Sequence, residues 1–330
     1  MKVTTLWCLC AISAMCWASC SGTSAADKKS DSADGPEICT EGEIVLDNGQ
    51  ICLKQDLGRG GSICYLSRSG EDRNIVNVYD EGRLIQQSYY AGKTLNRQSE
   101  GQSKDWSPWA WNPIQGGNSA GKGARILHAE RTDTSLYVKC VPMLWDMNDH
   151  EAEAIMEQWT TLDGNVAYVR NKITCNRTDS IYGEGIACSQ EIPAVYPISK
   201  LKNLYAYTGE NPFTGADLTS HTVECLQDGF WGRYDGKSNP VPTEKWMAFV
   251  DDSNWGLAVF TPTAETFLAG RFGDTDGEAM SSSTSYIAPL CTTALNKNSV
   301  MEYDYYLIVD NLDSIRSTVY ALNSKISKGL

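Results

Sequence analysis

Short apolar segments separated by polar turn residues recur along most of this chain. They are rich in Val, Ile, Tyr, Thr and Trp, which predicts β-strands, and they cover residues 75–79, 84–90, 125–130, 136–141, 166–175 and 246–250. Asp163-Gly164-Asn165 and Asp251-Asp252-Ser253-Asn254 predict hairpin turns. Residues 151–158 contain good helix formers, but the following Trp159-Thr160-Thr161 and the turn after it favour a strand there too.

The C-terminal segment changes to helical spacing. Its apolar positions are Leu312, Ile315, Val319, Leu322 and Ile326, with Asp313 as the predicted cap and Gly329 at the end. Many short strands and one late helix predict an all-β fold, a large antiparallel β-sandwich (supersandwich or jelly roll) with a short C-terminal helix. We find no internal repeat, so residues 39–330 are predicted to form a single β-sandwich domain.

The N-terminus is typical of an export signal. Lys2 precedes an apolar run over residues 6–12, and small residues follow before Cys20. Residues 1–19 are therefore predicted to be a signal peptide. Trp17-Ala18-Ser19-Cys20 resembles a bacterial lipobox, which implies lipidation of Cys20 and a lipidated flexible tether over residues 20–38. Because Trp17 replaces the usual Leu, simple secretion is the alternative. We expect an exported protein of the cell envelope or outer membrane, in contact with the membrane only through its lipid.

Composition narrows the class of partner. The 330 residues carry 28 Lys+Arg against 41 Asp+Glu, a formal charge of −13. This balance argues against nucleic acid, because no basic surplus is available to displace counterions from phosphates. Ten Trp and 16 Tyr are too many for a disordered chain. No apolar run of about 20 residues follows the N-terminus, which argues against a membrane-spanning protein.

The cysteines after the export signal do not indicate a metal site. Neither a CxxC pair nor zinc-type spacing links them to histidines, and we predict neither a metal nor another cofactor. Asn48-Gly49 between apolar residues predicts a hairpin that would bring Cys39 near Cys52. Buried free thiols are the alternative.

A first candidate binding segment spans residues 80–92. If residues 84–90 form a strand, Gln86, Ser88 and Tyr90 share one face, and Ile85, Gln87 and Tyr89 share the other. Polar groups on both faces are unusual for a sandwich strand and suit a ligand with many hydroxyls, with Arg83 beside them. The alternative is an Asp80–Arg83 ion pair that closes a turn, with the tyrosine hydroxyls bonded internally.

A second candidate is the tryptophan-rich loop over residues 106–118. Trp106, Trp109 and Trp111 stand among prolines and a Gly pair, which mark a shaped loop. Indole faces stack on the C–H faces of sugar rings, so we expect a glycan platform. Asn112 and Gln115 are its predicted hydrogen-bonding partners, and Trp145 is a further predicted substrate-binding residue. The alternative is that these rings fill the core.

Carboxylates supply the candidate chemistry. Our shortlist is Asp80, Asp146, Glu157 and Glu191, with Glu157 and Glu191 as the preferred catalytic pair and Asp80 in reserve. A carboxyl group beside aromatic faces in a cleft can have a raised pKa, which glycosidic cleavage requires of its general acid. His128 is a candidate substrate-binding or polarising group, although a structural histidine is the alternative.

Several strings together resemble a family of secreted lipoproteins from polysaccharide-degrading bacteria. They are DEGRLIQQSYYAG, WAWNPIQGG, PMLWD, EQWTTLDGNVAYVR, QEIPAVY and WMAFVDDSNWGLAVF, between residues 80 and 260. The resemblance implies a fold similar to the galactose-mutarotase-like supersandwich or a concanavalin-like jelly roll, whose concave sheets hold sugars. It implies an environment and not a reaction.

Three functions follow from these observations. The first is a glycoside hydrolase that cleaves a poly- or oligosaccharide with paired carboxylates. The second is a polysaccharide lyase, in which Tyr89 or Tyr90 abstracts a proton, His128 assists and Arg83 neutralises a uronate. The third is a non-catalytic surface glycan-binding lipoprotein, which needs the tryptophan platform and no acid pair.

Overall fold

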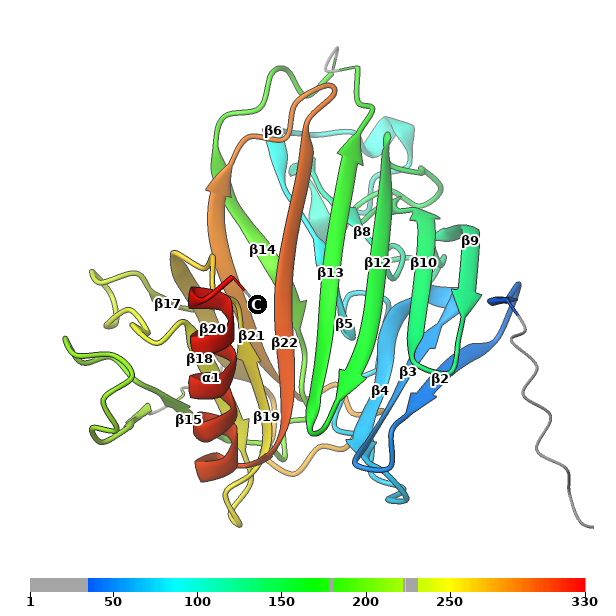
Figure 1. Ribbon diagram of the computed structural model, residues 1–330. Coiled ribbons are helices and arrows are strands. Elements are labelled where there is room, and N and C mark those ends of the chain that lie inside the picture. Colours follow the sequence, from blue (N-terminus) through cyan, green and yellow to red (C-terminus); the bar gives the residue numbers. More distant parts are fainter. Residues whose placement is uncertain (1–34, 179–180, 222, 224–230, 330) are drawn as a thin grey trace, which may run out of the picture. The chain divides into compact units, whose positions relative to one another are not determined.

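Antiparallel strands form most of the regular structure of this protein (Figure 1). The computed structural model describes residues 35–178, 181–221, 223 and 231–329. The predicted signal peptide, Cys20 and most of the predicted tether lie outside the described residues, so these assignments stay predictions.

Two large sheets contain nearly all the strands of the described chain. The first has, in spatial order, β1 (Glu37–Ile38), β9 (Arg125–Arg131), β10 (Ser135–Val141), β12 (Ala154–Asp163), β13 (Val166–Cys175), β22 (Val300–Asn311), β19 (Trp255–Phe260), β18 (Trp246–Val250), β15 (Asn203–Ala206) and β16 (Thr219–His221). The second has β17 (Gly232–Tyr234), β20 (Thr266–Phe272), β21 (Thr284–Thr293), β14 (Cys188–Val195), β5 (Ile85–Ser88), β4 (Ser62–Arg68), β3 (Ile51–Asp56) and β2 (Glu43–Asp47).

Apart from the C-terminal helix, the remaining elements are short. β8 (Pro113–Ile114) pairs with β5 and with β11 (Met143–Leu144), and β6 (Ala91–Leu95) forms a separate ribbon with β7 (Trp109–Trp111). Short 3-10 turns, η1 (Leu57–Arg59), η2 (Gln98–Glu100) and η3 (Lys104–Trp106), lie between strands.

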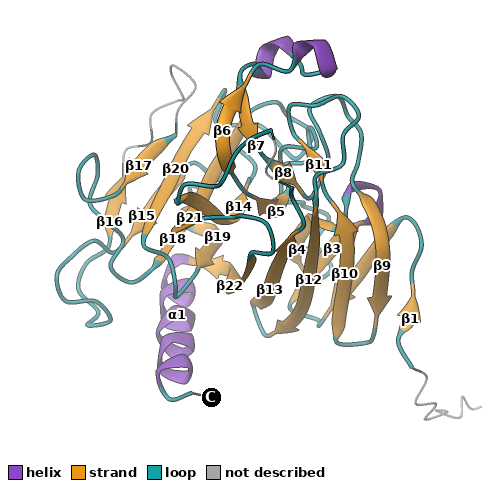
Figure 2. Ribbon diagram, turned by 90° about the horizontal axis from the view of Figure 1, so that it is seen from above, coloured by secondary structure: helices purple, strands orange, loops and turns teal. Residues whose placement is uncertain are grey.

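The two sheets pack face to face as a sandwich (Figure 2). Along β12, Ala154, Met156 and Gln158 are buried and alternate with less buried residues, so one face of the strand points into the space between the sheets. Ile85 and Ile287 of the second sheet belong to the same core. The predicted all-β sandwich is confirmed.

One helix, α1 (Leu312–Ser327), lies beside β18, β19 and β22 on the outer face of the first sheet (Figure 1). Its buried residues Ile315 and Val319 pack in one cluster with Trp246 of β18, as the helical spacing predicts. The predicted cap was wrong by two positions. Asn311 still has extended backbone and accepts a hydrogen bond from the Ser314 N–H at 3.0 Å, whereas Asp313 already lies in the first turn. No helix among the described residues is long and apolar enough to cross a membrane.

Most predicted strands and both predicted hairpin turns are present, and the ambiguous segment before Asp163 is strand β12. The prediction for residues 75–79 was wrong, because only Val76 forms an isolated bridge there. The Asn74 side chain accepts hydrogen bonds from the N–H groups of Leu66 and Val76, and the Asn77 side chain accepts one from Tyr79. Such local side-chain bonds compete with a strand ladder.

The hairpin predicted at Asn48-Gly49 is present as β2–β3, with Asp47 paired to Cys52. It does not bring Cys39 to Cys52, and both are free thiols. Cys39 instead donates its backbone N–H to Ala129 of β9, so its chain follows the first sheet while Cys52 lies in the second.

A chain of buried polar side chains crosses the interior and joins the two sheets. Gln158 of β12 donates to Asn171 at 3.0 Å, and Asn171 donates to the Tyr303 hydroxyl at 2.9 Å. That hydroxyl lies 3.2 Å from the Tyr89 hydroxyl, which donates its hydrogen to Gln87 Oε1 at 2.9 Å. Because these groups are out of water, each depends on its partner. The inner face of β5 is therefore fixed to the first sheet by hydrogen bonds.

We predict that Tyr89→Phe lowers the free energy of unfolding by about 1–3 kcal/mol, because Gln87 loses a buried hydrogen-bond partner. Chemical denaturation measures this change. Tyr79→Phe is the matched control, since Tyr79 is 50% exposed and should change stability by less than about 0.5 kcal/mol. Equal effects of the two substitutions would contradict the account.

Candidate functional site

A cleft of about 1050 Å³ lies on the outer face of the second sheet, the face turned away from the first sheet. Strands β5, β14 and β20 contribute to it, together with the loops around η3 and β11. It is lined by Asp80, Gly82, Arg83, Ser88, Tyr90, Trp106, Trp109, Asn112, Ile114, Trp145, Cys188, Ser189, Glu191, Ala194, Tyr196, Trp231, Arg233, Leu268, Phe272 and Leu290.

Glu191 of β14 forms the floor of the cleft. It pairs with Ser88 on the neighbouring strand β5 and with Leu290 on the neighbouring strand β21. The register of β14 then shifts between Glu191 and Val195, at Pro193, which cannot donate to a strand ladder. As a result Ala194 lines the cleft as well as Glu191, although residues three apart on a regular strand point to opposite faces.

The carboxyl group of Glu191 is almost completely buried. The residue is 7% exposed, and this burial raises its pKa above the ordinary value. Hydrogen bonds from Ser88 and from the Tyr286 hydroxyl oppose the shift, because both favour the ionised form. Burial outweighs them, so the cleft floor holds a carboxyl group that retains its proton to a higher pH than an exposed glutamate.

One wall of the cleft is a cluster of three indole rings. Trp106 contacts Trp109 and Trp145 edge to face, with ring centroids 5.2 and 5.3 Å apart. The Trp109 indole donates to Asn112 Oδ1 at 3.1 Å, and Asn112 donates to the Tyr89 carbonyl at 2.7 Å. This last bond fixes the tryptophan loop to the end of strand β5.

The opposite wall is also aromatic. Trp231 stacks on Tyr286 with ring centroids 4.5 Å apart, and Tyr196 contacts both rings. Gly270 of β20 pairs with Tyr286. A Cβ atom on Gly270 would lie 2.7 Å from the Trp231 ring, so the glycine makes room for the indole.

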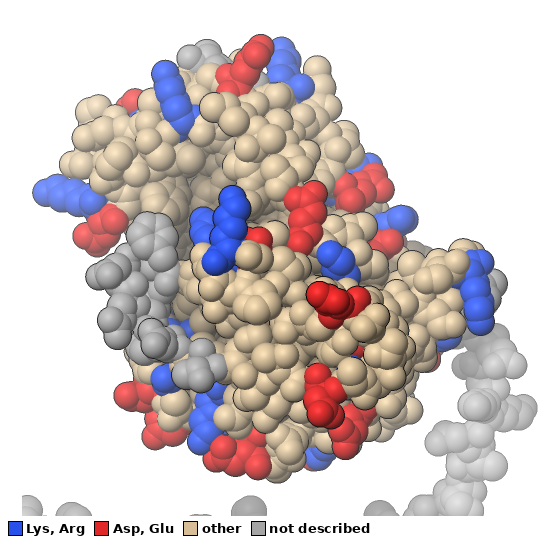
Figure 3. Space-filling model, turned by 90° about the vertical axis from the view of Figure 1, so that its left-hand side faces the viewer, with Lys and Arg blue, Asp and Glu red and all other residues tan. Residues whose placement is uncertain are grey.

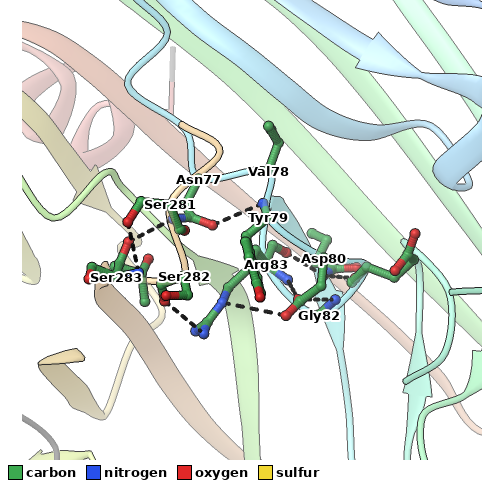
Figure 4. A network of polar contacts seen from close by, with 12 residues as sticks. Asn77, Val78, Tyr79, Asp80, Gly82, Arg83, Ser281, Ser282 and Ser283 are labelled. Atoms are coloured by element: carbon green, nitrogen blue, oxygen red, sulfur yellow. Dashed lines mark hydrogen bonds and ion pairs between the residues drawn. The ribbon is translucent and has the colours of Figure 1, made fainter. Parts of the chain in front are cut away.

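A turn over residues 80–83 lies at the edge of the cleft (Figure 4). Asp80 Oδ1 accepts hydrogen bonds from the N–H groups of Gly82 at 3.0 Å and Arg83 at 3.1 Å. The Arg83 side chain extends toward Ser282, whose carbonyl lies 3.4 Å from Nη2, and its Nε lies 3.9 Å from Asp80 Oδ2. The next residue, Leu84, has a φ of +72°, a conformation that L-residues rarely adopt.

This turn contacts both walls. Gly82 lies against Trp145, because a Cβ atom there would be 2.5 Å from the indole. Arg83 lies over the Tyr196 ring at 5.3 Å and near the Phe272 ring at 5.9 Å. The turn closed by Asp80 and Arg83 is therefore also part of the surface of the cleft, so the two interpretations of this segment are compatible.

Eight of the residues predicted from the sequence come together here. They are Asp80, Arg83, Tyr90, Trp106, Trp109, Asn112, Trp145 and Glu191.

Glu157 and His128 do not reach the cleft. Both belong to the first sheet, where Glu157 accepts a hydrogen bond from Tyr137 at 2.7 Å and lies 3.9 Å from Lys172, while His128 contacts Glu130. Because Met156 and Gln158 point into the core, Glu157 points to the outer face of that sheet. The structure therefore does not pair Glu157 with Glu191.

Other predicted residues are buried and serve the fold. Tyr89 belongs to the polar chain between the sheets, and Trp111 lies in the core with the Arg177 guanidinium 5.1 Å from its ring. Gln86 accepts from the Gly116 N–H and Gln115 donates to the Gly60 carbonyl. Asp146, whose pKa burial raises, accepts a hydrogen bond from Gln102 at 2.7 Å.

Sequence reasoning missed Tyr196, Trp231, Arg233 and Tyr286. Trp231 and Arg233 lie in or beside β17, an edge strand of three residues that pairs with β20 more than thirty residues later. The only signal in the sequence is a Trp and an Arg separated by Gly232, and nothing local shows which partner strand places them at the cleft.

The described residues contain no group of three or more His, Cys, Asp or Glu side chains that could hold a metal ion. On the face shown in Figure 3, basic and acidic side chains are interspersed, without a broad patch of either sign.

No protein-family model and no curated protein matches the sequence. The fold is similar to a galactose mutarotase-like protein from Lactobacillus casei, with 10% identity, a TM-score of 0.46 and coverage of 81% of this chain and 100% of that chain. A galactose mutarotase related enzyme from Lactobacillus acidophilus shares 9% identity at a TM-score of 0.46, covering 81% and 97%. A 4-alpha-glucanotransferase from Thermococcus litoralis shares 11% at a TM-score of 0.41, covering 84% and 40%.

These neighbours include the mutarotase type that the sequence resemblance implied. The predicted lipoprotein family stays a prediction. Because every one of these similarities is remote, we base the proposed function on the residues of the cleft.

We predict that Gly82→Ala lowers the free energy of unfolding by about 1–3 kcal/mol, because the added methyl group overlaps the Trp145 ring. The effect should largely disappear in a Trp145→Ala background, where the space is free. A double-mutant cycle of denaturation experiments measures this coupling. Additive effects would show that the glycine does not act through Trp145.

Proposed function

We propose that the cleft binds a poly- or oligosaccharide and that the protein hydrolyses a glycosidic bond in it. The observation that carries this proposal is the buried carboxyl group of Glu191 on the floor of an aromatic cleft that Asp80 also lines. Two carboxyl groups with different environments are the minimum that glycoside hydrolysis requires.

The walls support sugar binding. Trp106, Trp109 and Trp145 stand on one side of the floor, and Trp231 and Tyr196 stand on the other. Sugar rings offer apolar C–H faces to such side chains and hydroxyl groups to polar neighbours. Lining residues of β14 and its extension run from Cys188 to Tyr196, roughly 25 Å of strand, so the cleft has room for more than one sugar.

In the proposed mechanism Glu191 is the general acid. Because its pKa is raised, the Glu191 carboxyl group retains the proton that it gives to the leaving oxygen when the glycosidic bond breaks. After that transfer, the Tyr286 hydroxyl donates a hydrogen bond to the carboxylate and stabilises the ionised form. Asp80 is the second carboxylate, acting on the sugar or on a water molecule. The distance between the Asp80 and Glu191 carboxyl groups determines whether the configuration of the anomeric carbon is retained or inverted.

The arrangement offers less support for a lyase. Tyr89 and His128 lie outside the cleft, and burial raises the pKa of Tyr90 well above its ordinary value, so almost no Tyr90 phenolate is present near neutral pH to abstract a proton.

Glycan binding without catalysis is the second candidate. It is favoured by the hydrogen bonds that Glu191 accepts from Ser88 and Tyr286, because these bonds give Glu191 a structural role in the cleft floor that needs no catalysis.

We predict that Glu191→Gln lowers kcat on a glycan substrate by about 10²–10⁴-fold, the usual contribution of a general acid. The loss should be smaller on an aryl glycoside, whose leaving group departs without protonation. Reducing-end assays and aryl release measure the two rates. Glu157→Gln is the matched control and should keep full activity. Equal loss on both substrates would contradict the acid role, and glycan binding without turnover by the wild type would favour the second candidate.

The pH dependence follows from the direction of the pKa shift. Because Glu191 must be protonated and burial raises its pKa, activity should persist above the ordinary glutamate range, near 4.3. It should fall as pH rises through the raised pKa. The pH profile of kcat/KM measures this limb, which should be absent from the residual activity of Glu191→Gln. An alkaline limb in that variant identical to the wild type would assign the ionisation to another group.

A further inference from the structure

The cleft carries two arginines, Arg83 and Arg233, and the only acidic partner described for either is Asp80 beside Arg83. Arg233 forms no ion pair with any residue that the structure describes, and its side chain is exposed. The side chain of Arg83 is only 17% exposed, and its one acidic neighbour, Asp80, lies at 3.9 Å. The Arg83 Nε is buried and has no hydrogen-bond partner in the described structure.

These arginines lie on the same wall. Arg83 lies 5.9 Å from the ring of Phe272, and Arg233 pairs directly with Leu268 across β17 and β20. Phe272 and Leu268 both line the cleft from β20, four positions apart, which is roughly 13 Å along the strand. Because the two arginines lie beside positions of β20 that are four residues apart, they face different parts of a bound chain.

The chemistry of the guanidinium group defines the ligand. It offers five N–H donors in a planar fork that matches a carboxylate, and Arg83 uses few of these donors within the protein. The whole chain carries a net charge of −13, so general attraction does not bring an anion to this cleft. Recognition must come from these two side chains.

We propose that the natural substrate is an acidic glycan, in which uronate carboxylates on different sugars bind Arg83 and Arg233. This inference rests on the proposed sugar-binding cleft and adds the class of sugar. The aromatic rings contact the apolar faces of the sugars, while the arginines select a charged substituent at C5 against a neutral one.

The test compares carboxylate sugars with their uncharged esters. Tetrasaccharides of galacturonate and of mannuronate, and the methyl ester of each, are titrated by calorimetry into the Glu191→Gln variant, in which turnover is slow. We expect at least one acid form to bind ten times or more tighter than its ester, with a preference that falls as salt increases. Arg233→Gln and Arg83→Gln should each reduce that preference about tenfold.

Arg131→Gln is the matched control, because Arg131 is exposed on β9 of the other sheet and the substitution changes the net charge equally. It should retain the preference. Equal affinity for acid and ester, no binding of either pair, or tighter binding of a sulfated galactan tetrasaccharide would overturn the proposal. Since Arg83 also belongs to the turn, Arg233→Gln alone decides the case if Arg83→Gln unfolds.

The two proposals fail separately. If the acid forms bind with the expected preference and the wild type releases no reducing ends, the substrate class stands and hydrolysis is wrong. If the wild type cleaves neutral glycans and shows no preference for acids, hydrolysis stands and the acidic substrate is wrong.

Discussion

The burial of the Glu191 carboxyl group on the outer face of a β-sheet is the constraint on which the cleft depends. An outer face is normally where a strand places such a group in water, but here Leu290 and aromatic side chains exclude solvent from it. A carboxyl group in that position requires hydrogen-bond donors, and Ser88 and Tyr286 supply them from the two neighbouring strands. The residues that donate hydrogen bonds to this carboxyl group are therefore also the residues that set the geometry of the floor.

Strand β5 connects this floor to the rest of the molecule. Its outer face presents Ser88 to Glu191, while Gln87 on its inner face and Tyr89 directly after its end belong to the polar chain that reaches the first sheet. A slip of one residue would exchange the two sets. The buried hydrogen bonds between the sheets thus fix the register of β5 and the position of Ser88. They thereby also fix the floor of the cleft.

Local patterns predicted much of this arrangement. The strand periodicity, the turns at Gly164 and Asn254, and the polar character of both faces of residues 85–90 were all readable from the sequence. The burial of Trp111 in the core and the position of the half-buried Trp109 in the cleft were not readable. The choice between core and surface within one short strand depends on what the rest of the chain places against it. Glu157 satisfied the same local criteria as Glu191, and only the sheet order separates them.

The protonation of Glu191 is the most direct test of this account. Carbon NMR of the labelled glutamate carboxyl groups, assigned by comparison with Glu191→Gln, gives the titration midpoint without reference to any substrate. We expect a midpoint above the ordinary value near 4.3, and a further rise in Tyr286→Phe, where a hydrogen bond to the ionised form is lost. A midpoint at or below the ordinary value would mean that the carboxyl group is ionised in its cleft and would contradict the central claim.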